Sequence, residues 1–134
     1  MNSYVGVDFH KDSCHGTVQT ESGEIVKQGY FKNAHPGYGD FFGGIDEAEV
    51  VIEAGSAWQP VYDWLADNGF DVKLADPRKM RIIAEVKIKT DARDSKALAD
   101  LLRADLIPEI YVPFAELVRL LEDFLESVYL VFVI

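Results

Sequence analysis

Cysteine, positive charge and long hydrophobic runs are all scarce in this sequence of 134 residues. The single cysteine, Cys14, cannot form an internal disulfide, and the amino-terminal residues lack the basic and apolar regions of a secretory signal peptide. The only long apolar run, residues 128–134, is much shorter than the roughly 20 residues needed to span a bilayer. We therefore expect a cytoplasmic protein without a membrane partner.

The scarce positive charge is unevenly distributed. Lys and Arg number 13 against 23 Asp and Glu, for a net charge of −10. Residues 77–96 hold seven of the basic residues and three of the acids. The net charge of this segment is therefore +4, and that of the rest of the chain is −14. A cationic segment on an otherwise acidic protein can direct a polyanion to one place. A solvated helix and loop is the alternative interpretation.

The pattern of apolar residues predicts one α/β domain. Runs of β-forming residues predict an antiparallel meander at residues 4–8, 14–20 and 24–31, in which Gly6 lets another element pack closely. An irregular helix is expected within residues 33–44. The remaining strands and helices alternate, which predicts a parallel βαβ unit. In order they are a strand at 49–53, a helix at 57–68, a strand at 70–75, and helices at 76–83, 91–106 and 114–126. Between the last two helices, residues 110–112 are expected as a short strand or an extended segment. A mixed five-stranded sheet with helices on both faces is the layout of the ribonuclease H-like fold.

Two of the predicted strands end in an acid, Asp8 and Glu53. If these strands are neighbours, the two carboxylates meet at the edge where α/β sheets bind ligands. Asp91 and Asp94 lie three residues apart, so they share one helical face with the apolar residue Leu98 and are directed toward the body of the protein. Capping of the helix amino terminus explains the same pair of acids without any site.

Four carboxylates in one pocket cannot all remain ionised unless cations compensate them. Two Mg2+ or Mn2+ ions would do so, because these hard cations take oxygen ligands and keep positions open for phosphate oxygens. Two ions about 4 Å apart can stabilise the attacking and leaving oxygens of a phosphoryl transfer. The acids therefore predict a metal-dependent phosphoryl-transfer site.

Basic side chains near the acids are candidates for phosphate contacts, because Arg and Lys bind phosphate oxygens. The candidates are Lys11, Arg78, Lys89 and Arg93. Lys11 could equally pair with a nearby acid. The three histidines, at positions 10, 15 and 35, are expected at the surface or in turns, because no Cys or His spacing accompanies them.

Four blocks of the sequence, residues 6–11, 53–60, 77–78 and 89–99, resemble the amino-terminal domain of the DEDD-type insertion-sequence transposases, relatives of the Piv DNA invertases. The resemblance covers about residues 4–113. It implies a fold like that of the RuvC Holliday-junction resolvase and DNA strand cleavage and transfer as the parent activity. It further implies an element-encoded RNA as a partner, and a metal-binding catalytic tetrad of Asp8, Glu53, Asp91 and Asp94.

The resemblance ends before the chain does. Members of the family continue through a charged helical region into a second domain with an attacking serine, whereas residues 127–134 carry no charge and the sequence given stops at Ile134. We therefore expect a catalytic domain at 1–113 and a helical segment at 114–134, in a truncated copy unable to complete transposition. The apolar tail predicts self-association.

Two other functions stay open from the sequence. One is a remnant that folds and binds nucleic acid or a partner without chemistry. The other is an actin-like or sugar-kinase-like ATPase, whose fold also begins with a strand Asp followed by a hairpin. The chain is too short for the two domains of that fold.

Overall fold

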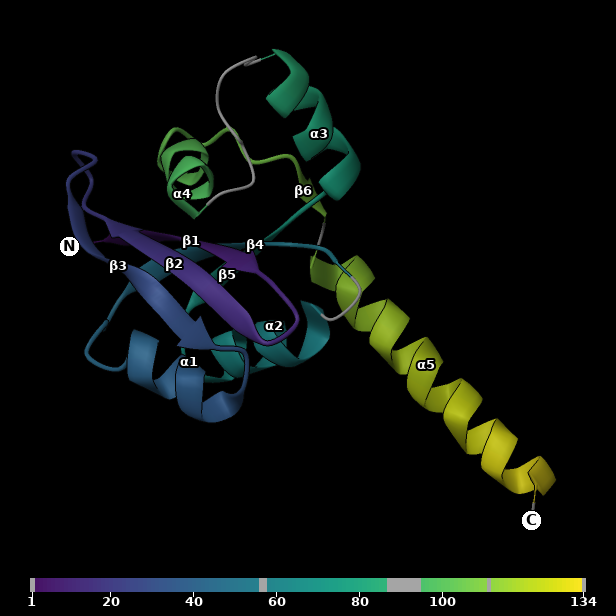
Figure 1. Cartoon of the computed structure of the whole chain (residues 1–134). Coiled ribbons are helices and arrows are strands. Elements are labelled where there is room, and N and C mark those ends of the chain that lie inside the picture. The colour runs from purple at the N-terminus through teal and green to yellow at the C-terminus, as the bar shows by residue number, and fades with distance from the viewer. Residues whose placement is uncertain (1, 56–57, 87–94, 111, 134) are drawn as a thin grey trace.

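The computed structural model describes residues 2–55, 58–86, 95–110 and 112–133 (Figure 1). The elements in chain order are β1 (Ser3–Phe9), β2 (Ser13–Gln19), β3 (Ile25–Lys32), α1 (His35–Phe42), β4 (Ala48–Glu53), α2 (Trp58–Asp67), β5 (Asp71–Ala75), α3 (Pro77–Val86), α4 (Ser95–Arg103), β6 (Glu109–Ile110) and α5 (Val112–Val133). The expected irregular helix is α1, and the expected βαβ unit is β4, α2 and β5.

One mixed sheet organises these elements, with the strand order β3-β2-β1-β4-β5-β6. The neighbouring pairs β1–β4 and β4–β5 are parallel, and the other three pairs are antiparallel. The α/β class and the meander of β1, β2 and β3 are as predicted. The predicted number of five strands is wrong, because the two-residue strand β6 pairs with Leu74 and Ala75. The short strand or extended segment expected at 110–112 overlaps β6 at Ile110, and residue 111 lies outside the described residues.

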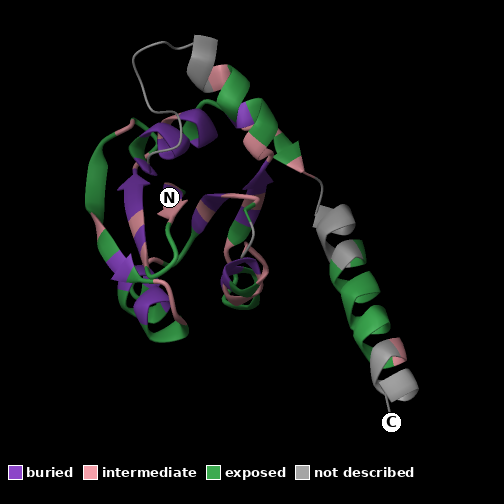
Figure 2. Ribbon diagram, turned by 45° about the vertical axis from the view of Figure 1, so that its right-hand side comes forward, coloured by how far each residue is buried: buried purple, intermediate pink, exposed green. Residues whose placement is uncertain are grey.

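Helices cover both faces of the sheet, α1 and α2 on one and α3 and α4 on the other (Figure 1). Successive side chains of a strand point to opposite faces, so β4 contributes to two cores. Val50 and Ile52 pack in the core under α1 and α2, whereas Val51 packs with Met80 of α3 and Leu98 of α4. Figure 2 shows this buried layer along the sheet and α4.

Helix α4 lies directly on β1 at Gly6, as the sequence suggested for this glycine. A Cβ atom on Gly6 would lie 2.2 Å from the carbonyl oxygen of Ser95 and 2.6 Å from the nitrogen of Ala99. The helix ends at Arg103 and not at residue 106 as predicted. The reason is the left-handed conformation of Asp105, with a φ of 58°, which turns the chain out of the helix.

Helix α5 extends away from the sheet, and much of it is exposed (Figures 1 and 2). It is longer than the predicted 114–126, because no glycine or proline interrupts residues 114–133. Arg119 donates a hydrogen bond of 2.6 Å to Asp63 of α2, which ties α5 to the body. Leu120 and Leu125 are more than 60% exposed. Within the described residues, no helix is both long and apolar enough to cross a membrane.

Candidate active site

Asp8 and Glu53 lie at one edge and on one face of the sheet. The β1–β4 register pairs Gly6 with Val51, and Asp8 and Glu53 are each two residues further along these parallel strands. Because side chains alternate along a strand, both acids are on the face that α4 covers. Asp8 and Glu53 therefore lie at adjacent strand ends, as expected from two neighbouring strands that each end in an acid.

Two histidines flank Asp8. His10 lies after β1, and its Nε2 atom is 3.1 Å from an Asp8 carboxylate oxygen. His15 lies opposite Asp8 on β2, and Tyr30 of β3 lies opposite His15. The rings of His15 and Tyr30 meet edge to face, with centroids 4.6 Å apart. The expectation of a surface or turn position is confirmed for His10, which is exposed after β1, whereas His15 is half-buried within β2.

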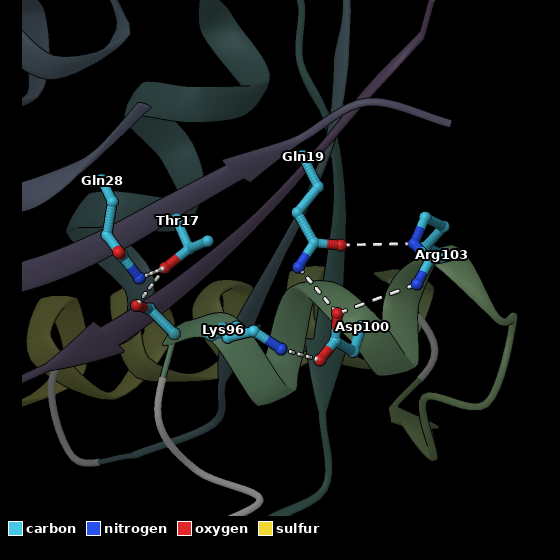
Figure 3. Close-up of polar contacts among 7 residues, drawn as sticks. Thr17, Gln19, Gln28, Lys96, Asp100 and Arg103 are labelled. Atoms are coloured by element: carbon cyan, nitrogen blue, oxygen red, sulfur yellow. Dashed lines mark hydrogen bonds and ion pairs between the residues drawn. The ribbon is translucent and has the colours of Figure 1, made fainter. Parts of the chain in front are cut away.

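The first residue of α4 is docked on the same part of the sheet. The Ser95 hydroxyl is almost fully buried and lies 2.6 Å from His15 Nδ1 and 2.6 Å from Thr17 Oγ1. Gln28 donates a further hydrogen bond of 2.9 Å to Thr17 (Figure 3). Since His15 is opposite Asp8 in the sheet, these contacts hold the start of α4 beside the strand acids.

A second polar cluster holds α4 one turn further on (Figure 3). The buried Gln19 side chain donates a hydrogen bond of 2.7 Å to Asp100 and accepts one of 3.2 Å from Arg103. Lys96 donates to the other oxygen of Asp100 at 2.8 Å. Burial by itself would raise the pKa of Asp100, but the hydrogen bonds from Lys96 and Gln19, with the charges of Lys96 and Arg103, hold it below its usual value.

The described residues hold two of the four predicted acids. Asp91 and Asp94 lie outside the described residues, as do Lys89 and Arg93. Within the described part of the chain, no three His, Cys, Asp or Glu side chains gather into a metal site. Asp8 and Glu53 offer carboxylate oxygens from adjacent strands, which are the ligands that Mg2+ and Mn2+ take. They are two of the four predicted metal ligands.

The two described basic candidates lie at the same edge. Arg78 is exposed in the first turn of α3, which follows β5 directly, and the last residue of β5, Ala75, pairs with Glu53. Asp76 begins this helix by accepting a hydrogen bond of 2.9 Å from the Arg78 backbone N–H. Lys11 is exposed between β1 and β2. Both cations therefore flank the strand acids.

A cavity of about 450 Å³ opens beside Glu53. The sequence did not suggest this cavity, because its walls come from elements that are far apart in the chain. The Trp58 side chain is only half-buried. The lining residues are Phe9, His10, Lys11, Asn33, Glu53, Gly55 and Trp58.

Comparisons with known proteins agree on one family. A family model of the IS110-type DEDD transposases, described as "Transposase", matches residues 5–126. The chain is also similar to a transposase for insertion sequence element IS1533 from Leptospira borgpetersenii, with 32% identity over 106 residues. That match covers 75% of this chain and 31% of the relative, so the chain spans less than a third of the relative's length. The chain belongs to the IS110-type DEDD transposase family.

Proposed function

We propose that residues 1–113 form a ribonuclease H-like, RuvC-like domain that cleaves and transfers DNA strands by metal-dependent phosphoryl transfer. The observation that carries this proposal is the placement of Asp8 and Glu53 on one face at adjacent strand ends. Ser95 is docked beside them, and Asp94 directly precedes Ser95 in the chain, with Asp91 three residues earlier. We infer that these two acids complete the site.

The proposed metal ligands are Asp8, Glu53, Asp91 and Asp94. When bound, Mg2+ or Mn2+ ions would neutralise charge on the phosphate and activate the attacking oxygen. His10 contacts an Asp8 oxygen at 3.1 Å and would fix the orientation of that carboxylate, as outer-shell partners of metal ligands do.

The proposed nucleic-acid contacts are the basic residues at the same edge. Lys11 and Arg78 are both exposed there, and we extend the set to Lys89 and Arg93 in the cationic segment. The acidic remainder of the chain repels phosphate, so DNA approaches through this segment. An element-encoded RNA and a second copy of the chain are further proposed partners.

The test is a comparison of wild type with Asp8→Asn, Glu53→Gln and Asp94→Asn. Melting temperature with added Mn2+ reports metal binding by mass action, and cleavage of labelled DNA in Mg2+ or Mn2+ reports chemistry. Glu49→Gln is the matched control. Glu49 lies near the other end of β4, the strand that carries Glu53, and forms an ion pair with Lys73. We expect each site variant, and not the control, to lose the Mn2+ shift and cleavage. An unchanged Mn2+ shift in Asp8→Asn would contradict the proposal.

A second candidate function is nucleic-acid binding without chemistry. It is favoured by the exposed cations Lys11 and Arg78, which can hold phosphate oxygens without a metal ion. Its signature would be salt-sensitive binding of DNA with no cleavage in either metal. Cleavage by the wild type that disappears in Asp94→Asn would exclude it.

A further inference from the structure

We infer that the cavity beside Glu53 binds one unpaired nucleotide of the nucleic-acid strand, with its base against Phe9 and Trp58 and its phosphate at Lys11. This inference rests on the proposed function. It identifies one nucleotide of the substrate that would bind at the strand ends that carry Asp8 and Glu53. The cavity volume of about 450 Å³ falls within the roughly 300–1,000 Å³ typical of small-ligand sites.

Two aromatic side chains form the apolar wall of this cavity. Phe9 ends β1 and packs against the core under α1 and α2. Trp58 begins α2, and its ring meets Tyr62 of the same helix edge to face, with centroids 5.6 Å apart. Rings held in this way offer a surface for stacking a base, and stacking tolerates any base because each has a π face.

The cation at the cavity is carried by a fixed loop. The Asn33 side-chain N–H donates a hydrogen bond of 2.9 Å to the His10 carbonyl, and the Asn33 backbone N–H donates one of 3.1 Å to Asp12. The hydroxyl of the buried Tyr38 donates to the Asn33 side-chain oxygen. Lys11 lies between His10 and Asp12, so this arrangement positions its backbone beside the cavity.

The polarity of the cavity favours a nucleotide within a strand. Its apolar wall suits a base. The cationic side chain of Lys11, which also lines the cavity, suits a phosphate. Glu53 lines the same cavity and belongs to the proposed metal site. A nucleotide seated here would therefore adjoin the phosphate that reacts, as a strand crossing the edge of the sheet requires.

Tryptophan fluorescence tests this inference, because the chain has two tryptophans, Trp58 and Trp64. The full chain is titrated with a labelled single-stranded oligonucleotide, without metal, and anisotropy reports binding while fluorescence reports stacking. We expect binding of the oligonucleotide to quench the tryptophan fluorescence of the wild type. Trp58→Phe should keep binding within about threefold and lose the quenching, and Trp58→Ala should bind roughly tenfold more weakly. Trp64→Phe should keep the quenching.

Lys11→Gln gives an independent measurement. We expect weaker binding and a salt slope reduced by about one, while the variant melts like the wild type. Salt-sensitive binding without quenching of Trp58 would overturn the nucleotide site and leave the proposed chemistry intact. Quenching without metal-dependent cleavage would support the nucleotide site and count against the chemistry. No binding of the oligonucleotide would overturn the nucleotide site, and the Mn2+ shift would still test the metal site.

Discussion

Gly6 and Ser95 touch through their backbones, since a Cβ on Gly6 would lie 2.2 Å from the Ser95 carbonyl oxygen. Gly6 is two residues before Asp8, and Ser95 is the residue after Asp94. This contact therefore fixes how closely the start of α4 approaches the strand that carries Asp8. Backbone atoms cannot yield as a flexible side chain can, so β1 requires glycine here.

Gly6→Ala should lower the free energy of unfolding by at least the roughly 1–3 kcal/mol typical of overpacking. The added methyl group meets backbone and Cβ atoms of α4, so the helix must move. Gly29→Ala is the control, because a Cβ at Gly29 on the edge strand β3 meets no atom within 4 Å. Urea unfolding of both variants checks the prediction, and equal stability of the two would contradict it.

Ser95→Ala should also destabilise the protein, by about 1–3 kcal/mol, because it leaves polar groups of Thr17 and His15 without their shared partner in a buried place. Ser22→Ala, at an exposed turn, serves as the comparison and should stay within about 0.5 kcal/mol of wild type. The free energy of unfolding from chemical denaturation is the quantity to measure. A neutral Ser95→Ala would mean that the hydroxyl does not hold α4.

The Asp100 cluster should make the docking of α4 sensitive to acid. The folded pKa of Asp100 is below its usual value of 3.8, so its interactions contribute stability above that pH and lose it as the pH falls through the folded pKa. Asp100→Asn removes this contribution. The stability difference between wild type and variant should therefore be largest near about pH 6 and shrink below about pH 4. A constant difference across this range would contradict the assignment.

Cys14 should be unreactive in the folded protein. Burial, and secondarily the negative charge of Asp8, raise the pKa of the Cys14 thiol to about 12, so almost no thiolate forms at about pH 8. A thiol reagent should modify Cys14 only after unfolding in denaturant. Asp8→Asn should remain protected as well, because burial is the larger cause. Rapid labelling of the native wild type would show that the β1–β2 core opens.

The central strands were predictable because burial on both faces leaves a clear pattern. The apolar run before Glu53 and the early strand before Asp8 each end in an acid, and parallel strands bring such ends together. By contrast, β6 has two residues, too few for alternation to distinguish a paired strand from the extended segment equally expected at 110–112. The left-handed Asp105 that ends α4 follows from local backbone geometry, which no sequence pattern specifies.

The polar contacts under α4 and the cavity could not be predicted for another reason. Ser95 meets His15 and Thr17 across about 80 positions of sequence, and single polar residues so far apart share no spacing that marks them as partners. The cavity is likewise lined by residues at the end of β1, after the end of β3 and at the start of α2. Asp91 and Asp94 as ligands stay a prediction, because both lie outside the described residues.

The most direct test of the account is anomalous scattering from crystals of the full chain soaked in Mn2+. We expect two manganese peaks, about 4 Å apart, with carboxylate oxygens of Asp8 and Glu53 among their ligands and with Asp91 and Asp94 completing the shell. Glu53→Gln crystals should lose at least one peak. A soaked wild-type crystal with α4 docked on Gly6 and no manganese at Asp8 or Glu53 would contradict the account.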